Sequence, residues 1–405
     1  MNLRNLIMAD MATPVDILID HEIISAVCPS GKNPEPLQPA PSGVSLSLPG
    51  AIAFPGLINS HDHLDFNLFP PLGKGGYTNY RAWGKDIHIQ NEAEISAVLK
   101  IPLALRTQWG LYKNLLSGVT TVVNHGESLV IDDAGALISV LQNAYSLHSV
   151  AFEKNWKRKV NFPNSAKPIV IHVGEGTDAA AGREIDRLIK WNLFKKSLIG
   201  IHGVAMNERQ AKGFTALVWC PVSNFFLLDR TARIDRLKKE LPILFGTDST
   251  LTAGWNIWDH IRLARQVGHL TDKELFDSLT TTPARIWGLP NTGRIIPGQY
   301  ADLVIAGLRI DMPGPKAPKA PDKIGLDAFY SIDPEEFLLV IHHGQIRLFD
   351  ASLHDSLSSA GMETGNYQPV VVKGRRKYVQ GDLPRLVKKI TEFYPAASFP
   401  FQTSG

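Results

Sequence analysis

The 405-residue sequence has little cysteine and no long apolar stretch. Its two cysteines, Cys28 and Cys220, provide neither a disulfide framework nor a cysteine-type zinc site, which fits a reducing compartment. No run of about 20 apolar residues is present that would predict a membrane span. Asp10, Pro14 and Asp16 interrupt the N-terminal segment, so no signal peptide is predicted. The expected location is the cytoplasm.

The sequence also lacks a strong excess of charge of either sign. Lys and Arg number 42 and Asp and Glu 39, giving a net charge of +3, and the basic residues are scattered. The densest basic run, 373–377, lies between apolar segments and is interpreted as a hairpin turn. This composition does not indicate a nucleic-acid or membrane partner. With 44% hydrophobic and 20% charged residues, the composition is ordinary for a soluble globular enzyme.

The order of predicted elements indicates a barrel domain and a small β-domain. Residues 15–27 predict a β-hairpin, and a short strand is expected at 44–48. From residue 51, buried apolar runs alternate with helix-period segments, the pattern of βα units. Strands are predicted at 54–58, 119–124, 147–152, 169–173, 198–202, 216–220 and 243–246. Helices are predicted at 95–116, 134–144, 183–191 and 256–266.

These strands number seven, whereas a (β/α)8 barrel of the TIM type requires eight. About twenty residues separate positions 152 and 173, too few for a complete βα unit. Either 158–162 is a stunted strand, or the barrel is abbreviated around strand 4. After residue 280 short strands return, with a Pro/Lys-rich loop at 313–323 and a hairpin at 338–349. We therefore expect an α/β protein in which 1–50 and 286–405 form a β-sandwich and 51–285 form the barrel.

Two histidines stand where the first barrel strand ends. His61 and His63 are separated by one residue, so their side chains project from the same face of a strand. Active sites of parallel barrels form at this end of the strands, and imidazole is a common ligand of zinc-like ions. By itself this pair is more often two unrelated surface histidines in a loop than a metal site.

Three further polar residues close separate apolar runs. His172 follows 168–171, His202 follows 198–201, and Asp248 follows 241–247. A satisfied core histidine is the ordinary explanation of any one of them, but the joint pattern favours one shared site at the strand ends. Glu175 lies three residues beyond His172, and Gly174 permits the bend that would aim both at one point. A carboxyl group there is suited to proton transfer.

With these motifs the sequence resembles the amidohydrolase superfamily over most of its length. Within it, the pattern is similar to the mononuclear branch of cytosine, guanine and adenosylhomocysteine deaminases and triazine hydrolases. The matching segments are 55–64, the strands that end at His172 and His202, Glu175, 218–224, 246–248, 282–285, 288 and 293–305.

The resemblance implies a role for each of these residues. His61, His63, His172 and Asp248 would hold one divalent ion, with Zn²⁺ expected first and Fe²⁺ or Mn²⁺ as alternatives. Glu175, His202 and Asp248 would be catalytic, around a water whose pKa the ion lowers toward about 7. Binuclear relatives use a carboxylated lysine at the end of the fourth strand. Lys154, Lys157 and Lys159 lie near that point but end no convincing strand.

The resemblance implies hydrolytic deamination of a small cyclic amidine-like substrate. One alternative is hydrolysis of a cyclic amide, as in imidazolonepropionase. Another is a non-catalytic scaffold, as in the dihydropyrimidinase-related proteins, although every ligand position is filled here. A homodimer is a further expectation taken from the superfamily.

Four residues are candidates for substrate binding: Phe66, Trp83, Asn124 and His125. The Gly-rich loop 73–77 and the segment 79–88 are candidates for a lid. Trp255 and Trp258 could stack on a flat ring, but aromatic residues near helices more often belong to the core. The sequence does not identify the substrate.

Overall fold

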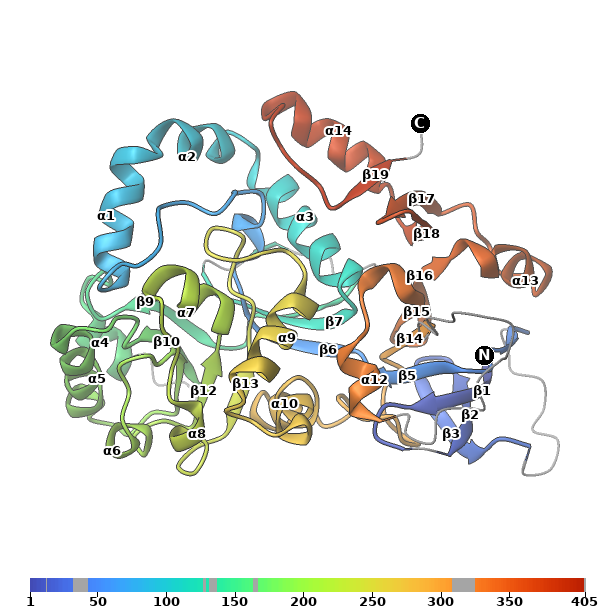
Figure 1. Ribbon diagram of the computed structural model, residues 1–405, viewed down its shortest axis with the longest axis horizontal. Coiled ribbons are helices and arrows are strands. Elements are labelled where there is room, and N and C mark those ends of the chain that lie inside the picture. Colours follow the sequence, from blue (N-terminus) through green and yellow to red (C-terminus); the bar gives the residue numbers. More distant parts are fainter. Residues whose placement is uncertain are drawn as a thin grey trace.

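The computed structural model describes residues 1–11, 13–31, 43–126, 129–130, 137–162, 167–307 and 325–403. A part rich in helices surrounds short parallel strands, and a large sheet built from both ends of the chain lies beside it (Figure 1). The predicted loop at 313–323 falls outside the described residues. None of the described helices combines the length and apolar character needed to cross a membrane.

Strands from both ends of the chain share one mixed sheet. Among the described residues its order is β19-β17-β18-β16-β15-β14-β5-β1-β2-β3, and β4 pairs with β1. The antiparallel pair of β5 and β14 joins the N-terminal and C-terminal strands. Residues from distant strands of this sheet pack into one hydrophobic cluster, so the sheet curls over a core as a sandwich does. The strands are β1 Asn2–Met8, β2 Pro14–Asp20, β3 Ile23–Pro29, β4 Ser45–Ser47, β5 Ala51–Pro55, β14 Leu303–Gly307, β15 Phe337–His342, β16 Gln345–Asp350, β17 Tyr367–Val372, β18 Arg375–Gln380 and β19 Phe401–Thr403.

The other strands are parallel and form the centre of the helical part. They make two sheets, β6-β7-β8 and β13-β12-β11-β10-β9. The backbone N–H groups of Thr247 and Asp248, just after β13, donate to the His61 carbonyl of β6, which closes the ring on one side. The strands are β6 Leu57–Asp62, β7 Val119–Asn124, β8 Ser139–Leu141, β9 Tyr145–Ser149, β10 Ile169–Val173, β11 Leu198–His202, β12 Ala216–Trp219 and β13 Ile243–Phe245.

One predicted strand, 54–58, is wrong because it spans two strands in different sheets. β5 ends at Pro55 and β6 begins at Leu57, with Gly56 between them. A side chain at Gly56 would place its Cβ 2.2 Å from Thr120 Oγ1, so only glycine fits where the chain crosses between the sheets. The apolar run continues through this crossing, which hides the boundary in the sequence.

The other side of the parallel ring is shortened. Only three residues, 142–144, connect β8 to β9, whereas adjacent parallel strands need a connection of a dozen or more residues. β8 and β9 therefore follow one another as one interrupted strand that pairs first with β7 and then with β10. The helix predicted at 134–144 is wrong at its end, where β8 lies; residues 131–136 fall outside the description. Residues 158–162, the suggested stunted strand, lie largely in the helix α4.

Helices cover the outside of the parallel strands. The predicted helix 95–116 is two helices, because Pro102 separates α2 from α3. α3 packs on β7, α5 on β10, and α10 and α11 on β13. The helices are α1 Tyr80–Gln90, α2 Glu92–Leu99, α3 Leu103–Leu116, α4 Trp156–Asn161, α5 Ala179–Trp191, α6 Glu208–Ala211, α7 Pro221–Leu228, α8 Ile234–Leu237, α9 Ile257–Val267, α10 Asp272–Ser278, α11 Thr281–Ile286, α12 Leu326–Tyr330, α13 His354–Ser359 and α14 Leu383–Phe393.

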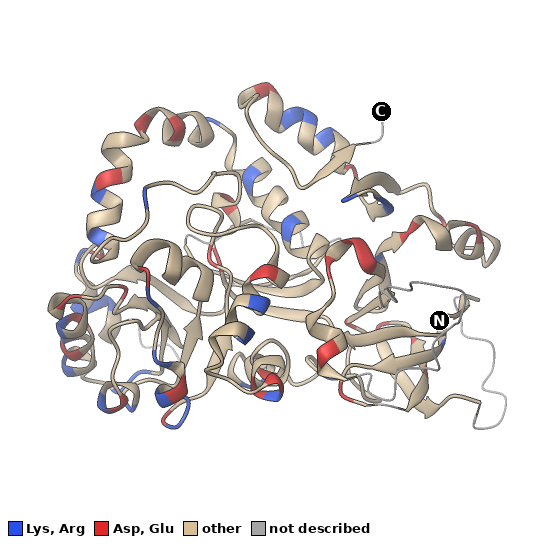
Figure 2. Ribbon diagram, in the orientation of Figure 1, with Lys and Arg blue, Asp and Glu red and all other residues tan. Residues whose placement is uncertain are grey.

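Aromatic side chains join the two parts of the molecule. Trp258 of α9 is fully buried and meets Phe54 and Phe329 edge to face, at centroid distances of 5.6 and 5.0 Å. Trp255 packs partly buried against the same core. Trp258 is therefore a core residue. Charged residues of both signs are interspersed over the outer helices, and the central strands carry few (Figure 2).

His260 of α9 should make stability depend on pH. Burial lowers its pKa to about 4, and its Nε2 donates to the Gly254 carbonyl. This pKa lies below the unfolded value of about 6.5, so His260 stabilises the fold only in its neutral form. Its contribution to the free energy of unfolding is complete above pH 6.5 and is lost as pH falls toward 4. Between pH 7.5 and pH 5, wild type should lose about 2 kcal/mol more free energy of unfolding than His260→Gln. Urea unfolding of both proteins at both pH values gives these losses. The other histidines are the same in the two proteins, so their contributions cancel when the losses are compared. Equal losses would contradict the assignment.

Candidate active site

The end of β6 presents alternate side chains to two environments. His61 and His63 face the space enclosed by the strand ends, and their rings lie 4.9 Å apart. Asp62, between them, points the other way and is fully buried. This alternation, which the sequence predicts for a strand, separates a pair of imidazoles from a buried carboxylate by one residue.

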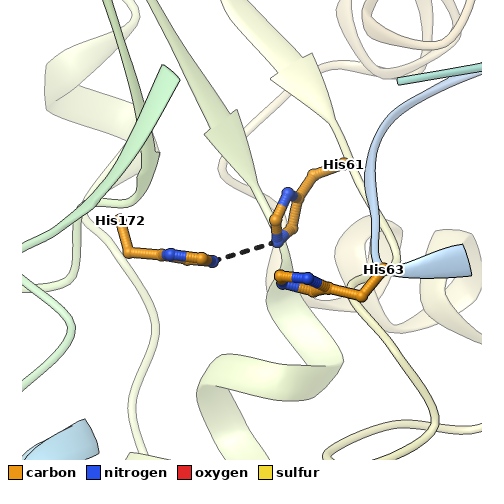
Figure 3. A group of neighbouring side chains, drawn as sticks. All are labelled: His61, His63 and His172. Atoms are coloured by element: carbon orange, nitrogen blue, oxygen red, sulfur yellow. Dashed lines mark hydrogen bonds between the residues drawn. The ribbon is translucent and has the colours of Figure 1, made fainter. Parts of the chain in front are cut away.

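His172 ends β10 and meets this pair. Its Nε2 lies 3.4 Å from His61 Nε2, and the three imidazoles converge in Figure 3. Its Nδ1 lies 2.7 Å from the His148 carbonyl, which accepts a hydrogen bond when this nitrogen carries the proton. That bond leaves Nε2 with a free lone pair, the form in which imidazole binds a metal.

His202 and Asp248 are the two predicted site residues with unusual backbone conformations. Their φ angles are 70° and 58°, in the left-handed region that side chains other than glycine rarely adopt. Each residue stands directly where a strand gives way to a loop. Such strain is found where a structure fixes a side chain for function, and here it turns both side chains toward the same centre.

The polar atoms of these residues gather within a small volume. Asp248 Oδ1 lies 3.7 Å from His61 Nε2 and 3.8 Å from His63 Nε2. Ligand atoms of His61, His63 and His172 lie within 4.8 Å of one another, and so do those of His61, His202 and Asp248. Burial lowers the pKa of His61 and His172 well below the usual range, so both are neutral. Neutral imidazoles and one carboxylate form a donor set that suits a divalent ion such as zinc.

The two carboxyl groups of the site titrate in opposite directions. Glu175 lies beyond the turn at Gly174, and its Oε1 is 3.7 Å from His202 Nε2. Burial and the neighbouring charge of Asp248 raise its pKa well above the usual value. The pKa of Asp248 is lowered despite burial, because the histidines, Ser223 and the Ser249 N–H stabilise its charge. One group therefore carries a proton under conditions in which the other is ionised.

A cavity of about 820 Å³ opens above these residues. His63, His172, His202, Glu175 and Asp248 line its base. Phe66 and Trp83, predicted to contact substrate, line its walls, and the predicted lid residues of α1 border it.

The other two predicted substrate contacts lie elsewhere. The Asn124 side chain accepts a hydrogen bond from the Leu64 N–H and so holds the loop after β6. His125 is buried, with its ring 4.4 Å from that of His172 and 5.2 Å from that of His61. Neither is among the residues that line the cavity. His125 instead packs against two of the candidate ligands.

The lysines considered for a binuclear site are not in the cavity. Lys157 lies over the Trp191 ring, and Lys159 pairs with Glu153. The end of β9, where a bridging lysine would stand, carries His148 and Ser149.

A polar network beneath the site was not found from the sequence. Lys113 of α3 is almost fully buried and donates to Asp62 at 2.9 Å. Asn114 and Asn67 donate to the same carboxylate. Asn59 links this group to Thr247, next to Asp248. The helical pattern of α3 hid Lys113, because one lysine in an amphipathic helix is normally a surface residue.

Lys113→Met should destabilise the protein strongly. The change leaves the Asp62 carboxylate buried without its cation, which typically costs about 3–5 kcal/mol. Denaturant unfolding measures this loss. Lys239→Met, at an exposed lysine, is the control and should change the free energy of unfolding by less than about 0.5 kcal/mol. A similar small effect for Lys113→Met would mean that the network is unimportant for stability.

Comparison with known proteins gives one family match. Residues 164–347 match the amidohydrolase family, and this segment contains His172, Glu175, His202 and Asp248. The matched segment, less than half of the chain, is therefore similar to the amidohydrolase family. A comparison with curated protein sequences finds no match.

Solved structures with the same fold extend the likeness to most of the chain. An adenosine deaminase from Xanthomonas campestris with bound zinc has 18% identity and a TM-score of 0.64, over 89% of this chain and 97% of its own. Atrazine chlorohydrolase from Arthrobacter aurescens TC1, complexed with zinc, has 17% identity and a TM-score of 0.63, over 89% and 99%. A triazine hydrolase from Arthrobacter aurescens has 16% identity and a TM-score of 0.60, over 89% and 98%. These likenesses show the fold of the chain, and two of the three neighbours hold bound zinc.

If the candidate site holds a divalent ion, His63→Ala should lose it. Removal of one imidazole from the donor set should weaken metal binding on the order of 100-fold or more. Elemental analysis after dialysis against low zinc gives the metal content per chain. His21→Ala, at an exposed histidine of the β2–β3 turn, should keep the wild-type content. Retention of metal by His63→Ala would exclude His63 as a ligand.

Proposed function

We propose that the protein is a metal-dependent aminohydrolase that deaminates a small cyclic amidine-like substrate. One observation carries the proposal: three groups that can move protons share the base of the cavity with the candidate ligands. His202 Nε2 lies 3.7 Å from Glu175 Oε1 and 3.9 Å from Asp248 Oδ2. A deamination needs such groups, because ammonia leaves only after protons have moved from water to the substrate nitrogen.

His61, His63, His172 and Asp248 would hold the ion. When bound, a divalent ion makes water more acidic and polarises the group under attack. The donor set fits this role, since burial keeps His61 and His172 neutral. These residues lie on β6, on β10 and after β13, so the rigid parallel strands fix their separation.

Glu175 is suited to give the first proton. Burial and the charge of Asp248 raise its pKa, which favours the protonated carboxylic acid, and the residue lines the cavity. A ring nitrogen of the substrate that faced this group would receive its proton. Protonation makes the neighbouring carbon a better target for water.

Asp248 is suited to accept the proton of the attacking water. Ser223 Oγ donates to its Oδ2 at 2.7 Å, and the Ser249 N–H donates to its Oδ1 at 2.7 Å. Thr252 adds a third hydrogen bond at 3.2 Å. These bonds hold the carboxylate in one orientation and keep it ionised until a proton arrives.

His202 is suited to orient the reacting groups between the two carboxyls. Its Nδ1 donates to Asn224 Oδ1 at 2.8 Å, because the Asn224 amide NH₂ donates to Thr231 and so fixes which amide atom faces the ring. Burial lowers the pKa of His202, which is therefore neutral with a free Nε2. This nitrogen faces the cavity base as an acceptor for a water or a substrate N–H.

Proton transfers through Asp248 and Glu175 would accompany the attack of water and the release of ammonia. The water oxygen bonds to the amidine carbon while Asp248 takes one proton from the water and Glu175 gives one to the ring nitrogen. The exocyclic nitrogen then gains a proton from Asp248 and leaves as ammonia, while the hydroxyl group on the carbon gives its proton to Glu175 and the ring nitrogen keeps the proton it received. The carbon keeps the oxygen as a carbonyl, so one water is consumed for each ammonia released.

Glu175→Gln should retain the metal and lose activity. The amide cannot donate the acid proton, so kcat/KM should fall on the order of 100-fold or more. A screen of purines, pyrimidines, pterins and triazines for ammonia release identifies the substrate, and metal content is measured on the same samples. Chelation should abolish turnover, and added zinc should restore it. Ring opening without ammonia would contradict deamination, and full activity without metal would contradict the metal dependence.

A further inference from the structure

The cavity changes character from its base to its mouth. The polar groups of the candidate active site, among them His202 and Asp248, lie at the base. Above them Phe66, Phe69 and Leu251 line the wall, and Ile89, Leu99 and Phe152 border the mouth. Arg81 and Lys85 also stand at the mouth, where their aliphatic stems extend the apolar surface and their charges reach solvent.

The apolar residues of the mouth are unusually exposed. Ile89 is 62% exposed, Phe152 50% and Leu99 49%. They come from α1, from the loop after β9 and from α2, so sequence proximity does not explain why they gather at one opening. Single exposed apolar residues are ordinary, but a group that rims a cavity marks a binding surface.

The cavity is also larger than the reaction requires. At about 30 Å³ for each water-sized group, 820 Å³ has room for on the order of 25 non-hydrogen atoms, whereas a bicyclic ring has about ten. The remaining volume is bordered by the apolar residues of the wall and mouth. A small polar substrate would leave the apolar wall and mouth of the cavity exposed to water.

We propose that the substrate carries an apolar substituent that runs from the reacting ring past Phe66 to the mouth. The substituent covers Ile89, Leu99 and Phe152, and its burial supplies binding energy at a distance from the chemistry. The inference rests on the proposed function for the place of the ring at the base. The substrate class is thus an alkyl- or aryl-substituted cyclic amidine, as distinct from a free base.

A homologous series of n-alkyl hydroxamates, from two to ten carbons, tests the substituent. The headgroup binds a divalent ion, and the chain lies along the wall. With zinc-loaded protein, calorimetric Kd should fall roughly threefold to fourfold for each added methylene until the chain passes the mouth. An n-alkanol series, followed by the fluorescence of the metal-free protein, should show the same dependence on chain length.

Two variants locate the effect. Leu99→Asn and Ile89→Asn should weaken the binding of the longest hydroxamates about tenfold and leave the two-carbon compound unchanged. Leu193→Asn, at a residue 64% exposed beyond α5 and away from the cavity, is the matched control and should change neither. A Kd independent of chain length in both series would overturn the inference, as would an equal effect of Leu193→Asn.

The outcome is separable from that of the proposed function, because the probes do not react. If Kd depends on chain length but no substrate releases ammonia, the proposed deamination is wrong and the apolar subsite is supported. If ammonia is released but Kd does not depend on chain length, the deamination is supported and the proposed subsite is wrong.

Discussion

Two backbone hydrogen bonds to one carbonyl join the beginning and the end of the parallel core. The N–H groups of Thr247 and Asp248 both donate to the His61 oxygen, at 3.1 and 3.0 Å. This contact sets His61 and Asp248 side by side although 187 positions separate them in the chain. Gly246 is required there, since a Cβ would lie 2.8 Å from His61 Cβ and 2.8 Å from a Val218 methyl group. The Lys113–Asp62 pair braces the same strand from below. The other site residues are placed relative to this junction.

The different acidities of Glu175 and Asp248 follow from their neighbours. Both are buried, and burial alone would raise both pKa values. Asp248 accepts hydrogen bonds from Ser223, Thr252 and the Ser249 N–H, which offset that cost. Glu175 is buried next to the negative charge of Asp248 instead, and both effects favour its neutral, protonated form. One buried anion thus makes its neighbour an acid.

The sequence predicted those features that depend on one strand at a time. His61, His63, His172, His202 and Asp248 each end a buried apolar run, and parallel strands bring their ends together. The crossing at Gly56 was missed because both flanking strands are apolar. Lys113 was missed because its partner is 51 positions away, and no local pattern marks a lysine that faces a buried carboxylate. β8 was missed because three residues cannot establish a period of two. The strand ends and the candidate ligands on them are marked by local sequence patterns, whereas the polar network and the cavity wall result from packing between distant segments.

The shortened side of the ring and the shape of the cavity have a common origin. Since β8 runs directly into β9, no helix separates them, and the loop after β9 lies beside α1. Phe152 of that loop meets Tyr80 of α1 edge to face at 5.2 Å and His148 at 5.3 Å. His148 in turn offers its carbonyl to His172. The same short segment therefore fixes a candidate ligand at the base and supplies an exposed aromatic ring at the mouth. A full βα unit between β8 and β9 would separate these two positions, so the abbreviated segment brings the support of His172 and the Phe152 ring to one cavity.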